Sequence, residues 1–143
     1  MIQILNNTSQ SVPKLKSFAS RIANEIVKQK MKYINIIYLN NEDIRRVNYQ
    51  YLKHNYPTDI ITFNLSESPK ILNAELYIGI ETVYYNSKIY STNFKEELKR
   101  VIIHGLLHLS GYNDKTREEK TEMIKQENYY MNLVSRETKK NDN

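Results

Sequence analysis

Cysteine is absent from this chain of 143 residues. Disulfide bonds, thiolate nucleophiles and zinc fingers built on cysteine are therefore excluded, and the absence fits a reducing compartment. Any metal ion bound by the side chains of this protein must rely on histidine, aspartate or glutamate.

Long apolar runs are absent as well. No stretch approaches the 18 or so apolar residues that a membrane span requires, and residues 1–10 lack the basic flank and apolar run of a secretion signal. We therefore expect a cytoplasmic protein with no membrane partner.

Acidic residues are outnumbered, with 16 acidic and 21 basic side chains and a net charge of +5. This balance favours polyanionic partners such as nucleic acid. Hydrophobic residues make up 40% of the chain and charged residues 26%, proportions typical of a folded globular protein. We expect a single domain over residues 1–138, followed by a disordered tail at 139–143.

Hydrophobic spacing and turn residues predict both strands and helices. In the helix that opens near Pro13, Phe18, Ile22 and Ile26 share one face. In the helix after Asn40, the predicted inner face is Ile44, Val47 and Tyr51. The short polar link at 66–73 indicates antiparallel pairing of the two strands that it joins. The predicted strands are 2–5, 33–39, 59–65 and 74–80, and the predicted helices are 13–30, 41–52, 81–90, 93–110 and 116–134.

The helix predicted at 93–110 carries two histidines in an apolar setting. His104 and His108 are four residues apart, so both imidazoles lie on one face, about one turn from each other. Gly111 ends the helix, which lets Asp114 fold back toward the pair. A pair of core histidines bonded to nearby backbone is the alternative interpretation, but the glycine and the carboxylate at these offsets favour a metal site.

The spacing H-x3-H-x2-G-x2-D reproduces the H-E-x-x-H-x-x-G-x-x-H frame of certain zinc proteases with two changes. Gly105 occupies the place of their general-base glutamate, and Asp114 that of their third histidine. Two imidazoles and one carboxylate suit zinc and leave a fourth position open, as in catalytic sites. We expect Glu97 to be a surface residue or to lie behind the ligands, and His54 to be a solvated loop residue.

The string HGLLHLSGYND at 104–114 resembles the H-G-x-L-H-L-x-G-Y-D-H signature of the YbeY family of bacterial endoribonucleases. Two upstream segments support the resemblance. VNYQY at 47–51 followed by PTDIITF at 57–63 is similar to the family's L-N-x-x-Y-R segment and P-T-D-V-L-S-F strand, and AEL at 74–76 is similar to its G-D-I strand start.

The resemblance implies an α+β fold with helices packed on a four-stranded mixed sheet, and a metal site on a buried C-terminal helix. It also implies one zinc ion and a single-strand-specific endoribonuclease acting in 16S rRNA 3′-end maturation and ribosome quality control. Carried over by position, the metal ligands are His104, His108 and Asp114. The family's arginine falls on Leu52, so its role is vacant or passes to Lys53 or His54.

Two other functions are compatible with the residues. A ribosome-assembly factor would use the metal only to hold the C-terminal helices together, without turnover. A zinc protease would require the glutamate that Gly105 replaces. The partners that the resemblance implies are single-stranded RNA, chiefly rRNA, and the small ribosomal subunit. For an RNA substrate, the following cations lie near loops that can rim a groove: Lys28, Lys30, Lys32, Arg45, Arg46 and Lys53.

Overall fold

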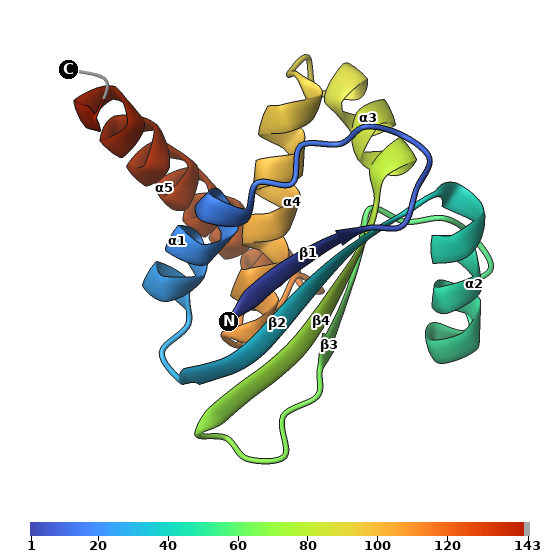
Figure 1. Cartoon of the computed structure of the whole chain (residues 1–143), viewed down its shortest axis with the longest axis horizontal. Coiled ribbons are helices and arrows are strands. Elements are labelled where there is room, and N and C mark those ends of the chain that lie inside the picture. The colour runs from blue at the N-terminus through green and yellow to red at the C-terminus, as the bar shows by residue number, and fades with distance from the viewer. Residues whose placement is uncertain (142–143) are drawn as a thin grey trace.

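The computed structural model describes the backbone of residues 1–141 and the side chains of residues 1–135. Its helices and strands alternate through the first half of the chain and end in three helices (Figure 1). In order, the elements are β1 (Ile2–Asn6), α1 (Lys16–Ile26), β2 (Lys30–Leu39), α2 (Asn41–Leu52), β3 (Ile60–Asn64), β4 (Ile71–Gly79), α3 (Ile80–Ile89), α4 (Phe94–Leu109) and α5 (Arg117–Asn141). In the described part of the chain, no helix is long and apolar enough to span a membrane.

The four strands form one sheet in the order β1-β2-β4-β3. β1, β2 and β4 run parallel, and β3 pairs antiparallel with β4. The predicted α+β fold with a four-stranded mixed sheet is therefore confirmed, as is the antiparallel pairing across the short polar link.

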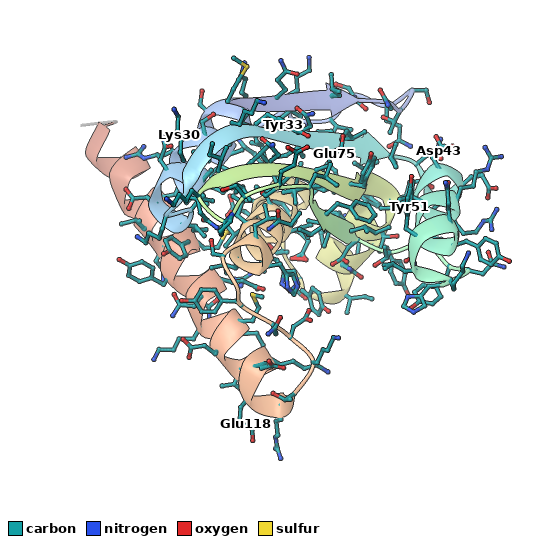
Figure 2. The ribbon with its side chains drawn as sticks, turned by 90° about the horizontal axis from the view of Figure 1, so that it is seen from below. Lys30, Tyr33, Asp43, Tyr51, Glu75 and Glu118 are labelled. Carbon is teal, nitrogen blue, oxygen red and sulfur yellow. The ribbon has the colours of Figure 1, made fainter. Side chains whose placement is uncertain are left out.

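The sheet is covered differently on its two faces. On one face, Ile34, Ile36 and Tyr38 of β2 are fully buried in the main core with residues of α1 and α4. On the other face, a smaller core joins Ile37 of β2 to Ile44 of α2. In Figures 1 and 2, α2 stands at one end of the sheet while α5 extends away at the opposite end. The helix that carries the histidines thus lies on the main core.

β2 and β4 begin earlier than their sequences predict, at Lys30 and Ile71 instead of 33 and 74. The first residues of β2 pair with the first residues of β4, Lys30 with Ile71 and Met31 with Leu72. The register of this pairing shifts between Met31 and Tyr33. Because this pairing joins segments about forty residues apart in sequence, local patterns do not report it.

The prediction that the first helix spans 13–30 is wrong at both ends. Leu15 has a left-handed backbone, so α1 starts at Lys16, and the extended backbone of Val27 ends it. The carbonyl oxygens of Pro13 and Lys14 instead accept hydrogen bonds from the buried Tyr38 hydroxyl, at 2.9 and 2.8 Å. The segment before the helix is thereby bound to β2.

The predicted inner face of α2 is wrong at one position. Ile44 and Asn48 are buried there, whereas Tyr51 is 60% exposed. The rings of Tyr51 and Phe63 make a T-shaped contact, and Tyr51 lies between α2 and the end of the sheet (Figure 2). The helix therefore packs on the sheet mainly through its first turns.

α5 continues well beyond 134, where the apolar pattern predicts its end. Its backbone reaches Asn141, so residues 139–141 of the predicted tail are helical. Residues 142–143 lie outside the described residues.

Gly79, the last residue of β4, generates a stability prediction. A Cβ atom there would overlap the backbone carbonyl oxygen of Thr58 and crowd Ile44. Backbone cannot move as freely as the end of a side chain, so we expect Gly79→Ala to lower the free energy of unfolding by about 1–3 kcal/mol. Urea unfolding of the metal-free protein measures this loss.

Gly105→Ala is the matched control. Its Cβ would meet Cδ1 of Ile60 at 2.6 Å and Cδ1 of Leu76 at 3.2 Å, both ends of flexible side chains. Alanine also favours a helix over glycine by up to about 1 kcal/mol. A loss for Gly105→Ala equal to that for Gly79→Ala would contradict this account of Gly79.

Candidate metal centre

α4 carries the two histidines and is buried along most of its length. Asn93 caps it, since its side-chain oxygen accepts a hydrogen bond from the Glu96 backbone N–H at 2.8 Å. Leu98, Ile102 and Leu106 are fully buried, whereas the side chains of His104 and His108 are about one quarter exposed. The helix thus holds the imidazoles at the edge of the core.

Gly105 lies against the sheet, where even a methyl group would crowd Ile60 and Leu76. A glutamate at this position would press against Ile60 and Leu76, whose side-chain ends would have to shift. Glycine at this position lets α4 pack closely on β3 and β4.

The end of α4 turns the chain back toward the histidines. The Gly111 N–H donates to the His108 carbonyl and the Tyr112 N–H to the Leu107 carbonyl, both at 3.1 Å. These two bonds, with a left-handed Gly111 at φ 99°, form a Schellman motif. Asp114 follows this turn and lies beside the pair, as its spacing predicts.

The three side chains place one donor atom each in a small triangle. Nε2 of His104 lies 3.0 Å from Nε2 of His108 and 3.2 Å from Oδ2 of Asp114. His108 Nε2 lies 3.3 Å from the same carboxylate oxygen. These residues form a group with the geometry to hold a metal ion.

The size of the triangle suits a tetrahedral ion. A zinc ion with nitrogen and oxygen ligands at about 2.0–2.1 Å sets those atoms about 3.3–3.4 Å apart, close to the separations among His104, His108 and Asp114. The donor set therefore fits zinc and leaves one apex of the tetrahedron for another ligand.

A glutamate from α5 orients the first histidine. The Nδ1–H of His104 donates to Oε2 of Glu127 at 2.7 Å, and Glu127 is 7% exposed. With the Nδ1 proton committed, neutral His104 presents the lone pair of Nε2 to the triangle. Arg100 in turn donates from Nη1 to Oε1 of Glu127 at 3.1 Å, which holds that carboxylate in place.

Opposing effects act on the pKa of His104. Burial lowers it, but the hydrogen bond and charge of Glu127, with the charges of Asp114 and Asp59, raise it above its ordinary value of 6.5. In the metal-free protein this imidazole therefore binds a proton more readily than a free histidine.

A cleft of about 790 Å³ adjoins His104. We call it the α4–α5 cleft, because α4 and α5 supply its walls together with Asp59, Tyr90 and Thr92. Glu97 of α4 lines it and is only 5% exposed, so the surface interpretation of Glu97 is wrong. Burial raises the pKa of Glu97; Arg100 opposes this shift, and Asp59 and Glu127 add to it.

The structure does not bring Lys53 or His54 into this group. Neither lines the α4–α5 cleft nor belongs to the His104, His108 and Asp114 triangle. Lys53 lies over the Tyr49 ring and His54 stacks on Tyr56, in the loop after α2. A catalytic role for them stays a prediction.

Two of the cations expected to rim an RNA groove are in ion pairs. Arg45 and Arg46 both contact Glu42, at 2.6 and 3.3 Å, on the exposed face of α2. A groove formed with Lys28, Lys30 and the remaining cations stays a prediction.

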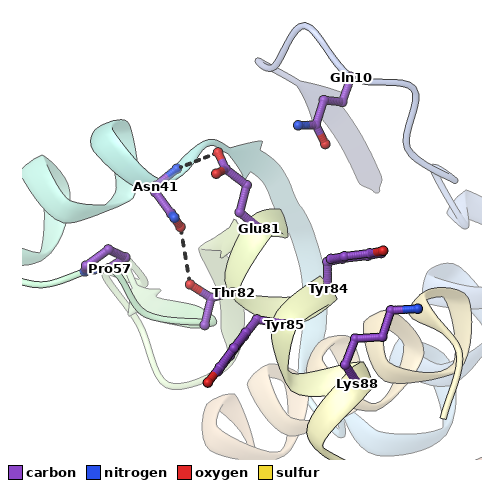
Figure 3. A pocket seen from close by; sticks show the side chains of 8 residues that line it. All are labelled: Gln10, Asn41, Pro57, Glu81, Thr82, Tyr84, Tyr85 and Lys88. Atoms are coloured by element: carbon purple, nitrogen blue, oxygen red, sulfur yellow. Dashed lines mark hydrogen bonds between the residues drawn. The ribbon is translucent and has the colours of Figure 1, made fainter. Parts of the chain in front are cut away.

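A second cavity, of about 700 Å³, lies between α2, α3 and the loop after β1 (Figure 3). Three of its polar side chains make hydrogen bonds within the protein. Oε1 of Glu81 accepts a hydrogen bond from the Asn41 N–H at 3.1 Å, and the Thr82 hydroxyl donates to Oδ1 of Asn41 at 3.3 Å (Figure 3). These bonds join the starts of α2 and α3.

Sequence reasoning missed Glu127, although a signal exists. Met123, Glu127 and Val134 are all buried and recur at helical spacing, so Glu127 is an acid on the apolar stripe of its helix. An acidic side chain in such a place needs a buried partner, and His104 is that partner.

Comparisons with known proteins agree on one family. The family described as Endoribonuclease YbeY matches residues 3–135. The Endoribonuclease YbeY of Chlorobium chlorochromatii is 37% identical over 134 residues, 93% of this chain and 85% of that protein. The one from Parabacteroides distasonis is 44% identical over 104 residues, 73% of this chain and 72% of that protein.

Among solved structures, the solution structure of a Thermotoga maritima protein has a similar fold. It aligns with a TM-score of 0.67 and 29% identity, over 99% of this chain and 93% of that one. The architecture described above is therefore shared over nearly the whole chain.

The contact between Glu127 and His104 generates a prediction for the metal-free protein. Glu127→Gln keeps an oxygen that accepts from Nδ1 but removes the charge, so we expect a lower pKa for His104. The pKa of His104 is raised in the folded state, so protonation of this imidazole adds to the free energy of unfolding. The added stability is complete below about pH 6.5 and disappears as the pH rises through the raised pKa. NMR titration of the imidazole, with urea unfolding at several pH values, measures both effects.

Glu122→Gln is the control, since Glu122 lies on the exposed face of the same helix. It removes an equal charge without touching His104. An unchanged pKa of His104 in Glu127→Gln, or an equal fall in both variants, would contradict the assigned contact.

Proposed function

This chain belongs to the YbeY family of endoribonucleases, and from that membership we propose that it cleaves single-stranded RNA with one bound zinc ion. The observation that supports the proposal best is the triangle of His104, His108 and Asp114 donor atoms at tetrahedral spacing. We further propose that its substrate is 16S rRNA, at the 3′ end, on the small ribosomal subunit, and that it serves ribosome quality control in the cytoplasm.

We assign His104, His108 and Asp114 as the protein ligands of the metal. When bound, zinc supplies Lewis acidity toward the oxygens of a phosphodiester. Asp114 brings a negative charge where the family signature has histidine, so the three ligands together carry a charge of −1 when the imidazoles are neutral.

The other residues around the site act on these ligands. Glu127 fixes the tautomer and the ring orientation of His104, and Arg100 holds Glu127. Gly105 leaves no carboxylate next to His104, in contrast to the proteases that share this spacing. An RNA substrate carries its own 2′-hydroxyl and anionic oxygens, so it demands less of the protein than a peptide does.

A loss-of-ligand variant tests the activity. We expect His108→Ala to slow cleavage of a labelled single-stranded RNA at least about 100-fold, because one of three ligands is lost. The assay is run over a zinc titration, and circular dichroism checks that the fold is intact. Glu122→Ala, on the exposed face of α5, is the matched control and should cleave as the native protein does.

The same assay separates the enzyme from the assembly factor. If zinc raises the melting temperature of the native protein but no RNA is cut at any zinc concentration, the metal is structural and the endoribonuclease proposal is wrong. Cleavage by His108→Ala at the native rate would likewise refute the assigned site.

A second variant tests the support given to His104. We expect Glu127→Gln to bind zinc about 10- to 100-fold more weakly than the native protein, the usual effect of losing a carboxylate behind a metal-bound histidine. Competition with a zinc-binding dye at fixed pH measures the affinity. Equal affinities for Glu127→Gln and the exposed control Glu122→Gln would show that the carboxylate has no such role.

A further inference from the structure

Glu97 is a buried acidic residue that is not part of the His104, His108 and Asp114 group. It lies in α4, lines the α4–α5 cleft and is only 5% exposed, so the little surface it retains faces the cleft. Among the described residues, the hydrogen bonds and ion pairs include none made by its carboxyl group. Among the described side chains, the fully buried polar atoms without a hydrogen bond do not include the Glu97 oxygens. The carboxyl group therefore stays open to the cleft, where it can accept hydrogen bonds from a bound molecule.

The charges of the cleft decide which part of a nucleotide suits it. Four carboxylates line it, those of Asp59, Glu96, Glu97 and Glu127, against the single guanidinium of Arg100. That guanidinium is already hydrogen-bonded to Glu127. A phosphate group would be repelled here, whereas an uncharged nucleobase would not.

The remaining walls suit a flat ring. Val101, Ile124 and Met131 contribute apolar surface to the cleft, and Ile124 is 55% exposed. Bases of single-stranded RNA bind between such side chains while their edges are read by hydrogen bonds.

The spacing along α4 fits a single nucleotide. Glu97 and His104 are seven residues apart, which places them on the same face of the helix, about 10 Å apart along its axis. This is comparable with the span of a nucleotide from its phosphate to the far edge of its base. A phosphate at the His104 end can therefore coexist with a base edge at Glu97.

We propose that the α4–α5 cleft binds the nucleobase next to the scissile phosphate and that Glu97 selects guanine. The proposal rests on the endoribonuclease function given above. A carboxylate only accepts hydrogen bonds, through two oxygens side by side. Guanine presents two adjacent donors on one edge, N1–H and the 2-amino group, whereas each other base presents one donor group on that edge.

Two nucleotides that differ only in the 2-amino group test this selection. Isothermal titration of the zinc-loaded protein compares guanosine 5′-monophosphate (GMP) with inosine 5′-monophosphate (IMP), whose phosphates contribute equally. We expect GMP to bind at least about tenfold more tightly, because IMP lacks one hydrogen bond to a charged group. In Glu97→Gln the two affinities should become equal.

Glu96→Gln is the matched control. Glu96 lines the same cleft on the neighbouring residue, but its carboxylate pairs with Lys99 at 3.3 Å. This variant removes the same charge and should keep the preference for GMP over IMP. Thermal melting checks the fold, and Glu97→Gln should melt no lower than the native protein because an uncharged amide replaces a carboxyl group whose charged form burial disfavours.

The outcomes separate this inference from the proposed function. No binding of GMP, equal affinities for GMP and IMP in the native protein, or a preference that survives in Glu97→Gln overturns the guanine site. If such a protein still cleaves single-stranded RNA, the endoribonuclease function stands without it. A GMP preference that depends on Glu97 in a protein that cuts no RNA supports the base site and refutes the endoribonuclease.

Discussion

Three donor atoms lie close together in the C-terminal half of this protein, and the helices there are arranged so that they stay close. Nε2 of His104, Nε2 of His108 and Oδ2 of Asp114 lie 3.0–3.3 Å apart. Lone pairs that face one another at this distance repel unless a proton or a cation lies among them. The fold maintains the arrangement with a buried helix, a Schellman turn at Gly111 and a glutamate from α5.

The same constraint explains why Glu127 is buried and why Arg100, whose side chain is 35% exposed, contacts it. Glu127 is buried because it holds His104, and Arg100 is close to the core because it holds Glu127. Each charge in this series offsets the burial of the next. α5 is thereby tied to α4 through a polar contact at the site as well as through the apolar contacts of Met123 and Val134. The hydrogen bond that orients His104 therefore also joins α5 to α4.

Local patterns in the sequence were enough to predict that His104, His108 and Asp114 meet, but not what surrounds them. His104, His108 and Asp114 fall within eleven residues, and helical geometry with one glycine turn determines their relative positions. Glu127 is 23 residues from His104, and its contact depends on how α5 crosses α4. The ends of β2 and β4 likewise depend on each other's pairing, and the exposure of Tyr51 depends on where α2 leaves the sheet. Periodicity within a single element carries none of this information.

The net charge of the whole chain is positive, whereas the charge of the cleft beside His104 is negative. The whole chain carries a net charge of +5, which attracts a polyanion from a distance. The wall beside His104 carries four carboxylates and one guanidinium, which repel phosphate at close range. The carboxylates of the cleft therefore disfavour the phosphate backbone of a polyanion, and a cation bound by His104, His108 and Asp114 would be the favourable place for a phosphate. The acidic wall thus orients the substrate, because it leaves the uncharged bases as the part of the strand that can enter.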